Sequence, residues 1–174
     1  DSYNVAVGYD AGLSVTTGVR NTLVGSLAGD ALTTGDNNVA LGFNALSADT
    51  QGDRNVAIGT DALAAQNFTT STDSYNVAVG FQAGVNVTTG VNNTIMGGLA
   101  GDALTIGGSN VAVGYAALST EDVGQNNVAI GNQALVNQNT SGGSAVNVYN
   151  TAVGSQAGLS VTTGINNVLI GGLA

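Results

Sequence analysis

The chain has 174 residues, of which 27 are glycine, and it contains no proline, cysteine, histidine or tryptophan. Two arginines, Arg20 and Arg54, stand against eleven acidic residues, so the formal net charge is −9. Nucleic acids and anionic membrane surfaces are bound through Lys and Arg, so this charge argues against both as partners. Without cysteine the chain has no disulfide framework and no thiolate metal site.

A phrase of the form N-x-x-x-G, first seen as "NVAVG" at residues 4–8, returns along the whole chain. Successive copies are evenly spaced, seventeen positions apart, except that every fourth unit carries an insertion of four or six residues. A fixed period identifies a repeat architecture, here one region spanning 1–174 with four-unit modules at 4–75 and 76–149 and a partial module at 150–174. The phrase begins at Asn4, Asn21, Asn38, Asn55, Asn76, Asn93, Asn110, Asn127, Asn150 and Asn167.

This repeat unit is too short for a helix pair or a leucine-rich repeat, but it fits one coil of a β-solenoid. The residues after each Asn alternate, so Val5 and Val7 share one face of a strand. We predict that this face lies inside the coil and that equivalent residues stack in register. The segments 13–15, 85–87 and 159–161 alternate in the same way and predict a second strand. The expected fold is an all-β parallel solenoid of about ten coils.

The middle strand position, Ala6 in the first unit, is apolar in all ten units. A strand that is apolar on both faces is buried on both faces, whereas a coil has one interior. We therefore predict that the larger members of this set, Leu23, Ile95 and Leu169, face outward and contact other copies of the chain in a symmetric oligomer.

Other recurring residues predict how a coil turns and how it is filled. The glycines equivalent to Gly8 and Gly18 are expected at corners, and the repeated asparagines are expected to stack as a ladder. A leucine replaces a glycine after the recurring alanine in four units, which predicts that the interior volume is kept constant by moving the filling side chain. These leucines are Leu46, Leu63, Leu118 and Leu135.

The phrase "NVAIG", at 55–59 and again at 127–131, resembles the repeat of the YadA-like heads of trimeric autotransporter adhesins, and similar repeats occur in bacteriophage tail fibres. The resemblance covers the whole chain, although its repeat unit is longer than is usual in that family. It implies a left-handed β-roll, a homotrimer, and attachment to a host-cell or surface receptor of glycan or protein type. It also implies an extracellular location on the bacterial surface, or, alternatively, on a virion tail fibre.

The residue types needed for catalysis are largely absent, so we expect no enzyme, no cofactor and no catalytic site. Acidic residues gather at 47–54 and 120–122, where a Ca²⁺ site is conceivable. We favour a solvated turn and predict no metal site, because the spacing matches no calcium loop. A column of threonines suggests an ice-binding solenoid as a third function, but Asn67, Asp122 and Asn139 interrupt it. Its members are Thr16, Thr33, Thr50, Thr88, Thr105 and Thr162.

The two insertions, 66–75 and 137–149, are expected as loops on one face of the solenoid. Phe68 is the aromatic residue lodged inside such a loop, while Tyr75 and Tyr149 precede the next Asn and are expected to anchor a corner. Two interpretations stand for the loops, a receptor contact and a slack connection without a ligand. No apolar run approaches the length of a membrane span, and we expect the chain to be a segment of a longer fibre.

Overall fold

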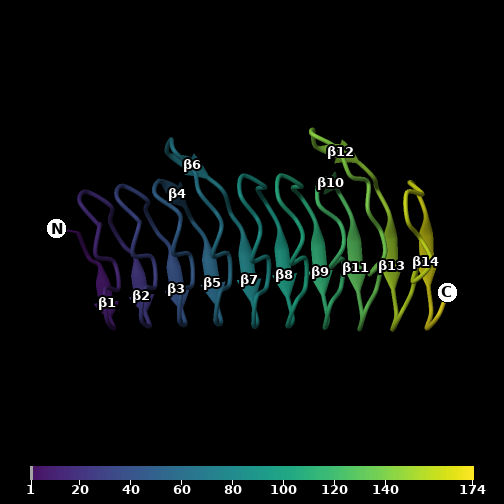
Figure 1. The fold of residues 1–174 in the computed structure, drawn as a ribbon, viewed down its shortest axis with the longest axis horizontal. Helices are drawn as coiled ribbons and strands as arrows, with labels where there is room; N and C mark the ends of the chain where they lie inside the picture. Colours follow the sequence, from purple (N-terminus) through teal and green to yellow (C-terminus); the bar gives the residue numbers. More distant parts are fainter. Residues whose placement is uncertain (1) are drawn as a thin grey trace.

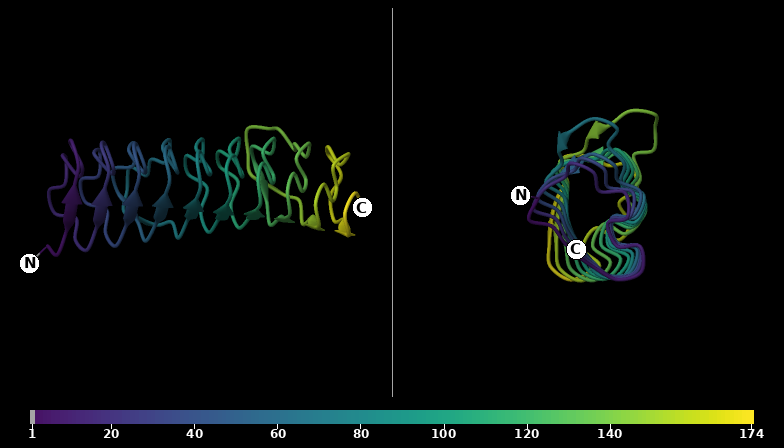
Figure 2. Two further views of the ribbon diagram at one scale, coloured as in Figure 1. Left: turned by 90° about the horizontal axis from the view of Figure 1, so that it is seen from below. Right: turned by 90° about the vertical axis from the view of Figure 1, so that its left-hand side faces the viewer.

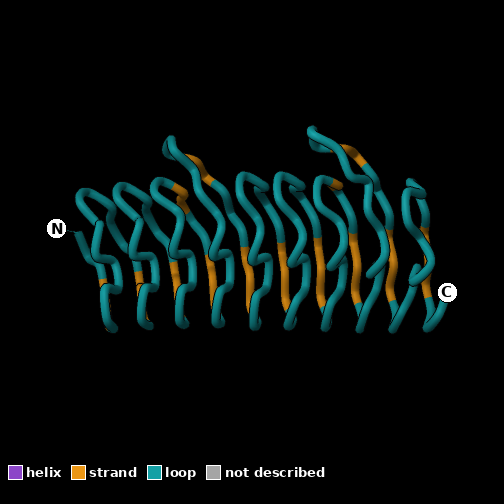
Figure 3. Tube along the Cα trace, viewed as in Figure 1, coloured by secondary structure: helices purple, strands orange, loops and turns teal. Residues whose placement is uncertain are grey.

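The computed structural model describes residues 2–174, which form an all-β structure with no helix in this range. Ten strands of three residues each form one sheet, and four shorter strands form two small pairs (Figures 1 and 3). The sheet strands are β1 (Val5–Val7), β2 (Thr22–Val24), β3 (Val39–Leu41), β5 (Val56–Ile58), β7 (Val77–Val79), β8 (Thr94–Met96), β9 (Val111–Val113), β11 (Val128–Ile130), β13 (Thr151–Val153) and β14 (Val168–Ile170). The short strands are β4 (Gly52–Asp53), β6 (Thr72–Asp73), β10 (Gly124–Gln125) and β12 (Val146–Asn147).

All neighbouring strands of the large sheet are parallel and follow one another in chain order. Val7 pairs with Val24, and Val24 pairs with Leu41, so equivalent residues of successive units stack as expected. Seen along the long axis, the coils superimpose around a common outline (Figure 2). The prediction of a parallel β-solenoid of about ten coils, with one repeat unit in each coil, is confirmed.

The two faces of the strand are the reverse of the prediction. Leu23 and Ile95, expected on the outside, are fully buried in the core of their own solenoid, and Leu169 packs against that core. Val5 and Val7, expected inside, are 51% and 58% exposed. Period-two alternation identifies which residues share a face but not which face is inward. The coil is narrow enough that alanine fills most of its inner positions, while the bulkier β-branched residues face outward.

The prediction that the filling side chain moves is confirmed. Leu46 is fully buried, and the residue three positions after it is the polar Asp49; the other three such leucines are each followed at that distance by glutamine or glutamate. In coils with glycine in place of this leucine, valine or leucine stands three positions later, and a Cβ on Gly29 would lie only 2.9 Å from Leu32 Cδ1. An apolar side chain from one position or the other therefore fills the same narrow space, as close packing requires.

The repeated asparagine forms one hydrogen bond within its own coil and another to the next coil. Asn21 Nδ2 donates to the carbonyl oxygen of Gly35 at 2.8 Å, which joins the start of the coil to its end. Asn21 Oδ1 accepts from the backbone N–H of Asn38 at 2.9 Å, in the next coil. The side chains form the expected ladder, and the eight from Asn21 to Asn150 are fully buried. A buried amide is stable here because both its donor and its acceptor are satisfied.

The corners depend on left-handed backbone as well as on glycine. Gly8 has φ of 140°, and a Cβ there would collide with the carbonyl oxygen of Gly25. Gly18, also expected at a corner, has no positive φ; the left-handed residue is Arg20, with φ of 60°, directly before the next Asn. The second strand predicted at 13–15, 85–87 and 159–161 is absent, because these segments turn too tightly to pair as strands. Their inward residues still reach the core, since Val87 is fully buried.

Candidate binding surfaces

The outer face of the ten-stranded sheet is a regular apolar surface that is partly exposed. Each strand presents its first and third side chains outward, and most of these are valine, isoleucine or leucine. Ile58 is 37% exposed, Met96 43% and Ile130 38%, all in the middle of the array. Parallel sheets usually have both faces covered, so an uncovered apolar face of this length marks a candidate contact surface.

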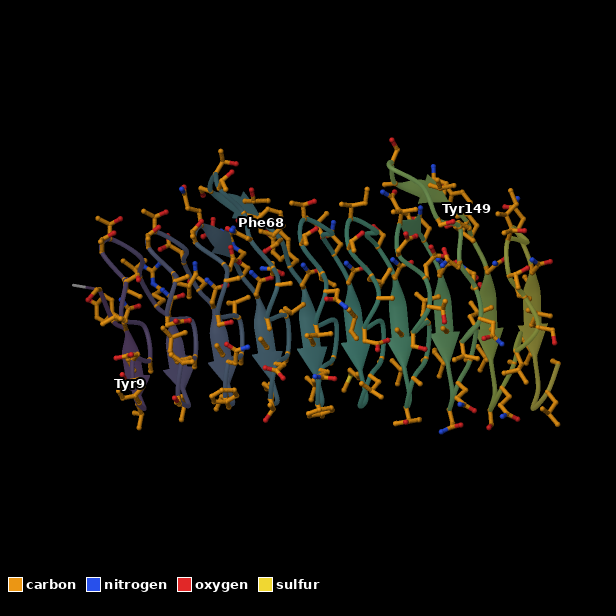
Figure 4. All side chains as sticks on the ribbon, in the orientation of Figure 1. Tyr9, Phe68 and Tyr149 are labelled. Atoms are coloured by element: carbon orange, nitrogen blue, oxygen red, sulfur yellow. The ribbon has the colours of Figure 1, made fainter. Side chains whose placement is uncertain are left out.

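The two insertions project from the same corner of the solenoid (Figures 1 and 2). Each contributes a short strand that pairs in parallel with the coil before it, β6 with β4 and β12 with β10. Phe68, the aromatic residue lodged inside the first loop, is only 7% exposed and packs inward. Tyr75 and Tyr149 are about half exposed, and Tyr149 lies at the upper part of the solenoid beside the second insertion (Figure 4). The loops are therefore attached at their base, and Phe68 is a structural residue.

A buried carboxylate holds the base of the first insertion. Asp49 is fully buried, and its Oδ1 accepts from the backbone N–H groups of Gly52 and Phe68, each at 3.0 Å. Its Oδ2 accepts from Gln66 Nε2 at 2.6 Å, and Gln66 Oε1 in turn accepts from Asn76 Nδ2 at 2.9 Å. An acid, an amide and the Asn ladder thus form one connected chain across three coils.

The second insertion repeats this arrangement with a longer acid. Glu121 is fully buried, and its Oε1 accepts from the N–H of Gly124 at 2.8 Å and from the hydroxyl of Thr140, also at 2.8 Å. Its Oε2 accepts from Gln138 Nε2 at 2.8 Å, and Gln138 Oε1 accepts from Asn150 Nδ2 at 2.7 Å. The prediction of a solvated turn is therefore wrong for both Asp49 and Glu121. The signal in the sequence was that acid and glutamine are separated by one full repeat unit in both modules.

Burial raises the pKa of the Asp49 carboxyl above its ordinary value of 3.8, while hydrogen bonds from Gln66 and from the backbone of Phe68 and Gly52 oppose the rise. Such a shift can mark a functional site, but here all the contacts of the carboxylate are structural. Among residues 2–174, no three acidic side chains converge where a metal ion could bind.

The threonine column uses its hydroxyl groups within the solenoid. Thr16 Oγ1 donates to the carbonyl oxygen of Thr33 at 3.0 Å, and Thr33 Oγ1 donates to that of Thr50 at 3.0 Å. Thr105 makes the same bond to the carbonyl oxygen of Asp122 at 3.1 Å. The column therefore helps to join neighbouring coils.

One cation is placed beside the first insertion. Arg54 forms an ion pair with Asp73 and lies over the ring of Tyr75, 5.6 Å from its centroid. All three groups are substantially exposed, so the pair adds little stability. It orients Tyr75 at the upper corner.

Searches for similar proteins yielded no matching family model, no matching curated protein and no matching solved structure. No helix in the described part of the chain is long and apolar enough to cross a membrane.

Proposed function

We propose that this chain is an adhesive segment of an extracellular fibre and that it works as a parallel homotrimer on the bacterial surface. The observation that carries the proposal is the uncovered apolar face of the ten-stranded sheet. The left-handed coil and the trimer follow from the resemblance of the repeat to YadA-like heads. The same assembly would also serve in a virion tail fibre.

The size of the apolar face supports an interface between copies. Two outward positions in each of ten strands supply about twenty side chains, the number that a standard protein interface has on each side. Complete burial of one such side chain contributes on the order of 1.5 to 3 kcal/mol, so partial burial of many is enough for stable association. The contact thus lies at the first and third strand positions, not at Leu23 and Ile95 as the sequence suggested.

Attachment, rather than catalysis, agrees with the rest of the molecule. Buried polar side chains such as Asp49 and Glu121 are engaged in joining coils and holding loops. Repeated units present the same surface many times, and linked weak sites gain affinity without any new contact. Three parallel chains would triple each surface.

Sedimentation equilibrium tests the assembly. The chain should sediment as a trimer, and the double substitution Ile58→Asp with Met96→Asp should give monomers with unchanged strand content by circular dichroism. Leu13→Asp is the matched control, because Leu13 is 69% exposed and lies outside the sheet. A wild-type chain that stays monomeric at high concentration would contradict the proposal.

Adhesion is measured separately, with beads coated with the trimer and applied to cells. Coated beads should be retained more strongly than beads coated with an unrelated acidic protein. Immunolabelling of intact bacteria and of virions then distinguishes a cell-surface fibre from a tail fibre. Retention no higher than that of the control beads would mean that this segment is a spacer.

A further inference from the structure

A row of exposed aromatic rings runs along the lower corner of the solenoid. The residue directly after the glycine that ends each sheet strand is aromatic in the first, third, fifth and seventh coils. These rings are 52% to 74% exposed, and Tyr9 shows their place at the lower end of β1 (Figure 4). Small residues occupy the same position in the coils between them. The rings are Tyr9, Phe43, Phe81 and Tyr115, and the small residues are Ser26, Thr60 and Gly98.

The backbone presents all of these positions in the same way. The carbonyl oxygen of Tyr9 accepts from the N–H of Leu27 at 2.9 Å, and the same bond joins Phe81 to Leu99 at 2.9 Å. The next residue has a left-handed φ of 50° to 61° in every coil. Since coils lie about 4.8 Å apart, rings in alternate coils repeat about every 9.6 Å along the solenoid.

Polar side chains lie beside three of the four rings. Asp10, Asn44 and Gln82 follow Tyr9, Phe43 and Phe81, and Asp61 follows Thr60 in the coil between the last two. Apolar residues occupy the same position in the second, sixth and seventh coils, namely Leu27, Leu99 and Ala116. Asn44 Nδ2 donates to Asp61 Oδ1 at 2.9 Å, which fixes two of these groups relative to each other. Carboxylates and carboxamides have several acceptor or donor sites each, so they retain capacity for a ligand's hydroxyl groups.

We propose that this aromatic row binds an extended, uncharged, β-1,4-linked polysaccharide lying parallel to the solenoid axis. In such a glycan, neighbouring sugars face in opposite directions. The length of the disaccharide repeat is close to the distance between alternate coils. Every second sugar would therefore present the same C–H face to a ring. An aromatic face carries partial negative charge and attracts the C–H groups of a sugar. Because the row contains no cation, a polyanionic glycan would gain nothing there.

This site is separate from the insertion loops. Tyr9 lies at the lower corner, whereas Phe68 and Tyr149 lie at the upper one, where the insertions project (Figure 4). The inference rests on the proposed attachment function and deepens it by naming the class of ligand. It also moves the expected contact away from the insertion loops.

Isothermal titration calorimetry of the full chain with hexasaccharides tests the inference. We expect binding of the β-1,4-linked hexasaccharides of glucose or N-acetylglucosamine, and at least about tenfold weaker binding of the disaccharides, which reach a single ring. Phe43→Ala should weaken hexasaccharide binding about fivefold or more, as loss of one stacking platform does for a base, and Phe43→Ala with Phe81→Ala should abolish it. Tyr75→Ala is the control, since it removes an equally exposed ring from the opposite corner.

Three results would overturn the inference. These are no binding of either β-1,4-linked hexasaccharide, equal binding of an α-1,4-linked hexasaccharide, and full binding by the double variant. A change in sedimentation mass on removal of the rings would also overturn it, because the row would then be a contact between chains. If coated beads adhere to cells but the chain binds none of the glycans, the attachment function is supported and the glycan site is refuted. If the chain binds the glycan but coated beads do not adhere to cells, the glycan site is supported and the attachment function is refuted.

Discussion

Replacing Asn93 by alanine should destabilise the solenoid more than any change at its surface. Asn93 is fully buried, its Nδ2 donates to the carbonyl oxygen of Gly107 at 3.0 Å, and its Oδ1 accepts from the backbone N–H of Asn110 at 3.0 Å. Alanine would leave both of these backbone groups buried without a partner. Each orphaned group costs about 1 to 3 kcal/mol, so the free energy of unfolding should fall by roughly 2 to 6 kcal/mol.

Urea denaturation followed by circular dichroism measures this loss, and hydrogen exchange at the amide of Asn110 locates it. Asn86→Ala is the matched control, because Asn86 also donates to a carbonyl oxygen, that of Asp102 at 2.7 Å, but is exposed to water. We expect a change below about 1 kcal/mol there, since water replaces the lost donor. Equal effects of the two substitutions would refute the view that the ladder stabilises by satisfying buried groups.

Three further predictions concern the core, the buried acid and the loops. Leu118→Ala should cost about 2 to 5 kcal/mol of unfolding free energy because it opens a cavity, whereas Leu13→Ala at the surface should cost less than about 0.5 kcal/mol in the same urea titration. Because the pKa of Asp49 is raised in the folded state, the native chain binds more protons than the unfolded chain just above pH 3.8. The contribution of Asp49 to the free energy of unfolding therefore falls as the pH rises through the folded pKa. Asp49→Asn should remove that dependence in urea titrations repeated across this range, and an unchanged slope would contradict it. Deleting 69–72 and 141–146, which restores the regular spacing, should preserve strand content and leave hexasaccharide affinity within about twofold by calorimetry; a larger loss would place the loops in the glycan site.

The period of the sequence determines much of this fold. Because the asparagines recur at a constant interval, equivalent side chains must stack, and the parallel pairing of Val7 with Val24 follows directly. The role of the leucines that replace glycine could also be predicted, since Leu46 occurs in a unit where Asp49 takes the place of the apolar residue found in other units. Repetition averages over many copies, so weak local signals become a reliable pattern.

The orientation of the strand and the buried acids were not predicted. Side-chain size favoured Val7 for the interior, but the width of a coil is set by its corners, and these allow mainly alanine inside. Acidic residues are almost always exposed, so Asp49 and Glu121 were assigned to solvent. Their burial depends on Gln66 and Gln138 one coil away, a pairing visible only once the coils are stacked.

The way in which coils are joined has a mechanical consequence. The hydrogen bonds between successive strands, such as that from the N–H of Val5 to the carbonyl oxygen of Asn21, link one coil to the next along the fibre. Under tension along the axis these layers of bonds are in series, so one layer can open while the others stay closed. A coil that peels away releases its chain as a tether of about 60 Å in place of one step of about 4.8 Å. Such a fibre lengthens under load as single coils unfold. A sudden increase in tension is therefore transmitted more gradually to the site at which the fibre is attached.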